Sequence, residues 1–130
     1  MEEQKLNDLL DALVLKTNTQ ENFTSMSEIQ RAISALQVLI TTTTRSGSEV
    51  FFEPEYNFLW ADASNGLKLI GVDRYYKCYN DILKAKDDRK DFTDSLIELQ
   101  EGIVEKDFEL LYTSILNFVS KEFINLSKNI

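Results

Sequence analysis

Carboxylates are the most abundant side chains in this sequence that are capable of acid–base chemistry. The 130 residues include 22 Asp and Glu, 14 Lys and Arg and no histidine. Asp87 and Asp88 are adjacent, while Glu98 and Glu101 share one face of an expected helix. Such pairs catalyse proton transfer or glycoside hydrolysis only where their environments separate their pKa values. Because both pairs lie in polar stretches, we interpret them as solvated surface and assign no catalytic residue.

Other reactive groups are few. Without histidine, the sequence lacks the base of Ser-His-Asp and Cys-His sites and the commonest zinc ligand. Cys78 is the only cysteine, so an internal disulfide is impossible. It lies in YYKCYN on an expected helix, where we interpret it as a small buried residue. The four glycines form no phosphate-binding loop. We therefore expect no enzyme activity, no cofactor and no metal.

The charge of the chain narrows the choice of partner. A net charge of −8 and a pI of about 4.5 disfavour direct binding to nucleic acids and to anionic membranes. The first residues, MEEQKLNDLL, do not resemble a secretory signal, and no apolar run approaches the ~20 residues of a membrane span. We expect a cytoplasmic protein.

Hydrophobic residues recur at three- and four-residue intervals over most of the chain, which predicts helices. The carboxylates and Cys78 are therefore expected to be positioned by helices. Residues 3–16 form the first expected helix. The second begins at Ser25, which pairs with Glu28 in a capping box. It is expected to fail within Thr41 to Thr44, ahead of a loop at 45–48. A strand over residues 38–43 is the competing interpretation.

The stretch 49–72 is the least helical part of the sequence. Pro54 interrupts any helix through it but suits the first turn of a new one. One interpretation places a short helix at 55–63. The other pairs 56–61 and 67–72 as a β-hairpin across Asn65-Gly66. Short apolar runs do not distinguish the two.

Three further helices are expected, over about 73–86, 91–101 and 105–126. Gly102 is expected to close the second of them in the left-handed conformation. The short connection then predicts that the last two helices form an antiparallel hairpin. The fold class is thus mainly α, a single domain over residues 1–130: a bundle of about five helices with a short β-hairpin or irregular insertion around 49–72.

Part of this C-terminal region resembles a known kind of protein. Over residues 96–119, Leu96 to Leu99 and then Asp107, Leu110 and Leu111 follow an L-x-E-L helix, acidic turn and D-x-x-L-L pattern. This is similar to the C-terminal helical hairpin of small bacterial proteins of unassigned function. The resemblance implies a helical protein of bacterial or bacteriophage origin and no particular activity.

Five of the fourteen aromatic residues lie within ten positions of each other, and they are the predicted binding site. They are Phe51, Phe52, Tyr56, Phe58 and Trp60. An irregular aromatic segment either closes a helical core or presents anchors to another protein. We therefore predict a non-enzymatic protein-binding module (an adaptor, a dedicated chaperone or an inhibitor) that binds another protein and can also form a homo-oligomer. The alternative is an acidic inhibitor or immunity protein that blocks a basic, nucleic-acid-binding partner by charge mimicry.

Overall fold

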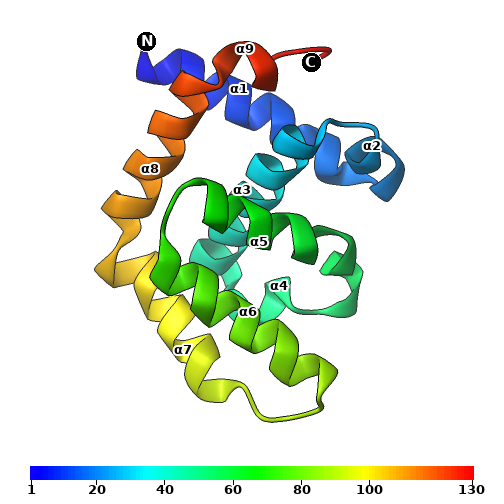
Figure 1. Cartoon of the computed structure of the whole chain (residues 1–130), viewed down its shortest axis with the longest axis vertical. Coiled ribbons are helices and arrows are strands. Elements are labelled where there is room, and N and C mark those ends of the chain that lie inside the picture. The colour runs from blue at the N-terminus through cyan, green and yellow to red at the C-terminus, as the bar shows by residue number, and fades with distance from the viewer.

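The chain is helical over most of its length. The computed structural model describes residues 1–130 and contains no strand (Figure 1). The elements are α1 (Glu3–Leu15), the 3₁₀ turn η1 (Lys16–Asn18), α2 (Gln20–Thr24), α3 (Glu28–Ser46), α4 (Ser48–Phe51), the 3₁₀ helix η2 (Pro54–Leu59), α5 (Trp60–Leu69), α6 (Asp73–Asp87), α7 (Thr93–Glu101), the π-helical turn η3 (Gly102–Lys106), α8 (Phe108–Lys121) and α9 (Phe123–Leu126). The prediction of a mainly α bundle is confirmed, and the β-hairpin is wrong.

The longest helix, α3, is the centre of the bundle. It packs against α1, α4 and α5, and Figure 1 shows the other helices arranged around it. Gly66 lies at its crossing with α5. A β-carbon there would stand 2.5 Å from the carbonyl oxygen of Ala32, so only glycine permits the two backbones to approach this closely. This explains why Asn65-Gly66 lies inside a helix rather than in the turn that the sequence suggested.

The start of α3 lies two residues later than predicted. Ser27, rather than Ser25, is the N-cap, and it forms a capping box with Gln30. The Gln30 N–H donates to Ser27 Oγ at 3.3 Å, and Ser27 N–H donates to Gln30 Oε1 at 3.0 Å. Ser25 instead ends α2, where its hydroxyl donates to the Asn22 carbonyl at 2.6 Å. Two serines two positions apart offered two possible caps, and the second of them is the one that caps α3.

The end of α3 lies beyond the threonine run. The helix continues to Ser46 and stops at Gly47, whose φ of 98° is accessible to glycine. The predicted break at 41–44 and the competing strand are both wrong. Thr44 donates its hydroxyl to the Ile40 carbonyl at 2.8 Å, and Thr43 is buried although its hydroxyl has no hydrogen-bond partner. Packing against the core therefore outweighs the low helix propensity of β-branched residues.

The segment 49–72 consists of three short helices. Pro54 is the first residue of η2, as a proline at a helix start prefers. Trp60 then begins α5, which runs four residues past Asn65. The interpretation of 55–63 as a short helix is closer to the structure than the hairpin, although the actual helix begins later and ends later.

The last helices are arranged differently from the prediction. α6 and α7 form the antiparallel pair, and α7 meets α8 at an open corner, so the predicted hairpin of the last two helices is wrong (Figure 1). Gly102 is not left-handed: its φ is −63°, and it starts the π-helical turn. A β-carbon there would overlap the Tyr75 ring, so this ring requires the glycine. The last helix also breaks at Glu122 into α8 and α9.

One continuous hydrophobic cluster of 27 buried residues lies between the helices. It draws on α1, α3, α5 and α6 and on one side of α8. The tyrosines Tyr75 and Tyr79 are among its largest fully buried side chains. None of the helices combines the length and hydropathy needed to cross a membrane.

Candidate functional site

The structure brings four of the five predicted site residues into ring contact, while the fifth, Phe58, packs its ring against Phe23 at 5.5 Å. Phe51 and Phe52 lie on α4 and at its end, Tyr56 and Phe58 on η2, and Trp60 begins α5. The ring of Phe51 lies 5.7 Å from that of Phe52 and 5.9 Å from that of Tyr56. Phe52 in turn lies 6.4 Å from the Trp60 ring. These separations are typical of aromatic pairs that stabilise each other, so these four residues form one aromatic cluster.

This cluster belongs mainly to the core. Phe51 is 0% exposed and Phe52 is 3% exposed, so neither side chain reaches the surface of the folded chain. The physical reason is that α4 turns back on α3 and directs both rings inward. The Trp60 Nε1–H donates to the Phe51 carbonyl at 2.8 Å, and the Tyr79 hydroxyl donates to the Trp60 carbonyl at 2.7 Å. The polar atoms of Trp60 and Tyr79 are thus also used inside the fold.

The outer part of the cluster is covered by a lysine. The ammonium of Lys86 lies 5.2 Å from the Trp60 ring and 5.4 Å from the Phe92 ring, within the range of a cation–π contact. Trp60, Tyr56 and Phe58 are partly buried and pack against the core. Whether these three side chains bind a partner stays a prediction.

The groups that are capable of chemistry do not converge. The Cys78 thiol donates to the Ser95 carbonyl at 3.0 Å, and burial raises the pKa of the thiol to about 11. The carboxylate of Glu98 pairs with Arg74 at 3.2 Å, and that of Glu101 pairs with Lys106 at 3.2 Å. No group of three or more Cys, Asp or Glu residues is arranged to hold a metal ion.

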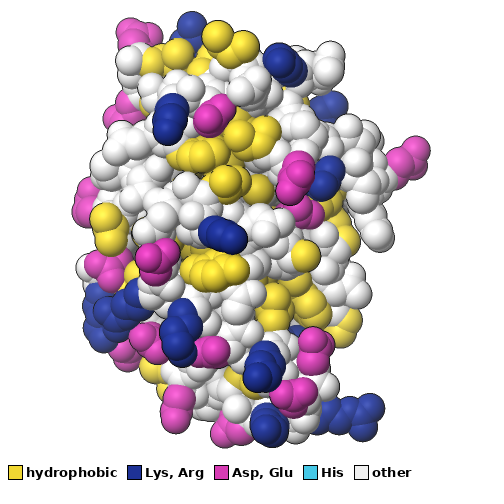
Figure 2. Space-filling view, in the orientation of Figure 1, with side chains coloured by type: hydrophobic (Ala, Val, Ile, Leu, Met, Phe, Trp, Pro, Cys, Tyr) yellow, Lys and Arg dark blue, Asp and Glu magenta, His cyan; other side chains and the backbone are white.

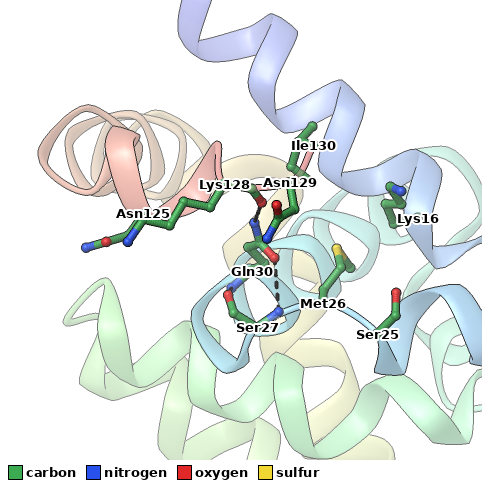
Figure 3. Close-up of a pocket in the computed structure, with 9 residues that line it drawn as sticks. All are labelled: Lys16, Ser25, Met26, Ser27, Gln30, Asn125, Lys128, Asn129 and Ile130. Carbon is green, nitrogen blue, oxygen red and sulfur yellow. Dashed lines mark hydrogen bonds between the residues drawn. The ribbon is translucent and has the colours of Figure 1, made fainter.

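A polar cleft of about 410 Å³ lies where the C-terminus meets the start of α3. Figure 3 shows Gln30 at its centre. The Gln30 side-chain amide donates to the Leu126 carbonyl at 3.0 Å and to the Lys128 carbonyl at 2.8 Å. The side chains of Lys16 and Lys128 extend away from each other on opposite sides of the cleft (Figure 3). Because Gln30 is fully bonded and the two ammonium groups diverge, this cleft is a junction of the fold.

A second surface has a different character, and we call it the Leu69 face. Its apolar residues are Ile29, Leu69, Ile70 and Phe118, and its charged residues are Glu28, Lys68 and Lys121. It comprises a cleft of about 410 Å³ between α3 and α5 and a cleft of about 240 Å³ between α5 and α8. Leu69 lines both clefts and is 45% exposed. Figure 2 shows several separate hydrophobic patches on the face of the molecule that Figure 1 presents, with charged side chains between them.

The sequence did not identify the Leu69 face. Its residues come from positions 28–32, 65–70 and 114–121, which only the packing of α5 between α3 and α8 brings together. Leu69 also fell in the stretch that had two interpretations. A helix continued through Gly66 would have placed Asn65, Lys68 and Leu69 on one outward side, and this was the available signal.

Neither protein-family models, curated proteins nor solved structures match this chain.

Proposed function

We propose that this chain is a non-enzymatic protein-binding module of bacterial or bacteriophage origin. It acts in the cytoplasm as an adaptor, a dedicated chaperone or an inhibitor. The observation that supports the proposal is the Leu69 face, where two adjoining clefts are centred on an exposed leucine. An apolar centre with a polar rim is the arrangement found at surfaces that bind protein.

The energetics of this face fit binding. Fully burying a large apolar side chain contributes about 1.5–3 kcal/mol, so covering the 45% of Leu69 that is exposed is worth roughly 0.7–1.4 kcal/mol, up to about tenfold in affinity. Ile29, Ile70 and Phe118 are half-buried and add to this as the clefts fill. They are also held by the core on their inner sides, so little side-chain entropy is lost on binding.

Affinity capture from the native cells with Leu69→Asp tests the proposal. The charged side chain is expected to abolish recovery of partners that the wild-type chain retains, because it would bury an unpaired carboxylate. Leu15→Asp is the matched control. Leu15 is also the last residue of its helix and is 74% exposed, but it lies outside both clefts. Identical partners for wild type and a folded Leu69→Asp variant would refute a role of the Leu69 face.

The second candidate function is inhibition by charge mimicry. Five exposed carboxylates occur within sixteen residues along α7, η3 and the start of α8: Asp94, Glu98, Glu101, Glu105 and Glu109. Only two of them form ion pairs. A basic partner held by this acidic surface would dissociate steeply as salt rises, whereas a complex centred on Leu69 would not. Titrating salt against the captured complex separates the two functions.

A further inference from the structure

We infer that the Leu69 face binds a second copy of this chain, forming a symmetric dimer. This inference rests on the proposed function, because it names the partner of the same face. Three features of the Leu69 face support it: its local charge, the order of residues across it and the burial of its apolar side chains.

The local charge is the first argument. The chain carries a net charge of −8, so most of its surface repels a second copy. The Leu69 face is an exception. Its two clefts are lined by one carboxylate, that of Glu28, and by two ammonium groups, those of Lys68 and Lys121. Two copies can therefore meet here without bringing acidic patches together, and a strongly basic partner gains nothing from this face.

The order of residues makes the face self-complementary. Glu28 lines only the cleft between α3 and α5, Lys121 lines only the cleft between α5 and α8, and Leu69 lines both. A two-fold axis near Leu69 would place Glu28 of each copy opposite Lys121 of the other, as an isologous interface requires. Lys68 lies beside the axis at an exposed position, from which its ammonium can turn to solvent.

The apolar residues match this arrangement. Leu69 of each copy would cover the other at the axis, and each copy's Ile29 and Phe118 would close on the opposite cleft. The residues of the two clefts expose much less surface than the about 800 Å² that each partner gives to a standard interface. Because the clefts are open and moderate in size, we expect a weak, reversible dimer.

Sedimentation velocity of the full chain tests the inference. Over loading concentrations from about 1 µM to about 1 mM, the wild-type mass is expected to rise toward that of a dimer. Leu69→Asp is expected to remain monomeric, while Leu15→Asp behaves as wild type. Far-UV circular dichroism of each variant checks that it is folded. A wild-type chain that stays monomeric throughout overturns the inference, as does dimerisation that survives Leu69→Asp.

Charge exchange tests the two-fold geometry. Glu28→Lys and Lys121→Glu each create two like-charge contacts, so each variant alone is expected to dimerise about tenfold more weakly. In an equal mixture, the lysine introduced in one variant would face the glutamate introduced in the other. The unchanged Glu28 and Lys121 of the two chains would also face each other, so dimerisation is expected to recover. A mixture no stronger than the separate variants overturns the two-fold arrangement.

These outcomes separate the dimer from the proposed function. A monomeric wild-type chain that still loses captured partners through Leu69→Asp excludes the second copy and leaves the protein-binding function intact. A monomeric wild-type chain whose captured partners are unaffected by Leu69→Asp excludes both.

Discussion

At the residue scale, groups that carry chemistry elsewhere serve here as internal connections. The Cys78 thiol donates to a backbone carbonyl of α7, and the Tyr79 hydroxyl donates to that of Trp60. The Tyr75 hydroxyl bonds the Asp107 carboxylate, which links α6 to the corner between η3 and α8. In each case a buried donor has one protein acceptor, as burial of a polar group requires. These hydrogen bonds and the burial around them allow predictions for the reactivity of the Cys78 thiol and for the pH dependence of stability.

The thiol of Cys78 should be inert in the folded protein. Its pKa is raised to about 11 by burial, so the thiolate that reacts with disulfide reagents is scarce at neutral pH. We expect slow modification by Ellman's reagent near neutral pH, becoming fast only when denaturant is added. The measurement is absorbance of the released product with and without urea. Rapid modification of the native chain would contradict the buried, hydrogen-bonded geometry.

Stability should fall in alkaline solution. The folded pKa of Cys78 is raised from 9.0 to about 11, and that of Tyr75 from 10.0 to about 12, with burial as the main cause of both. Because the folded state holds these protons more tightly, their contribution is complete below about pH 9 and is lost as pH rises from about 9 to about 12. Thermal melts across this range should show a steep decline, and Cys78→Ala or Tyr75→Phe should make it shallower. An unchanged slope in both variants would refute the assignment.

At the element scale, the side chain of Gln30 stabilises the ends of two helices. It completes the capping box of α3, and its amide holds the carbonyls of Leu126 and Lys128 at the end of α9. One buried side chain thereby ties residue 27 to residue 128, and the beginning of α3 and the C-terminal end should be lost together.

Replacing Gln30 by Met should therefore cost more than removing the cap alone. Gln30→Met keeps the side-chain volume but loses the three hydrogen bonds of the Gln30 side chain, for an expected loss of about 2–3 kcal/mol in the free energy of unfolding. Ser27→Ala, the control, should lose about 1 kcal/mol because Gln30 still holds the C-terminal carbonyls. Urea unfolding followed by circular dichroism measures both. Equal losses would contradict the double role of Gln30.

The helices that were predicted correctly are those with a regular apolar spacing within the helix itself. The first helix and the helix beginning at Asp73 have regular apolar spacing, and the structure confirms both within one or two residues. The stretch 49–72 was ambiguous because its ends depend on distant partners. Gly66 is helical only because α3 crosses it, and Gly102 avoids the left-handed conformation because Tyr75 lies against it. Neither contact is visible in a local sequence window.

The candidate site was harder to predict for the same reason. Four of the five aromatic residues at 51–60 did assemble, but they assembled against the core, because Phe51 and Phe52 are buried and their rings lie against Tyr79 of α6. The Leu69 face depends on three separated segments and on one exposed leucine. A single apolar residue in a sequence does not indicate whether its neighbours in space are apolar.

At the scale of the whole molecule, charge opposes self-association and salt should relieve this opposition. Two copies carrying −8 each, with centres about 35 Å apart, repel by on the order of 2 kcal/mol at about 0.01 M salt, where the screening length is about 30 Å. At about 0.15 M the screening length falls to about 8 Å, and the repulsion falls below about 0.2 kcal/mol. The Glu28–Lys121 pairs weaken over the same range, but exposed pairs are worth less than about 1 kcal/mol each.

The dimer should therefore strengthen as salt rises from about 0.01 to about 0.15 M, by about tenfold once the weakened ion pairs are included. Charge mimicry predicts the opposite sign, since attraction between an acidic chain and a basic partner is screened by the same ions. Sedimentation velocity of the wild-type chain at the two salt concentrations measures the first effect, with Leu69→Asp as the monomeric reference. Association that weakens with salt would mean that ion pairs, rather than the apolar centre at Leu69, hold the copies together.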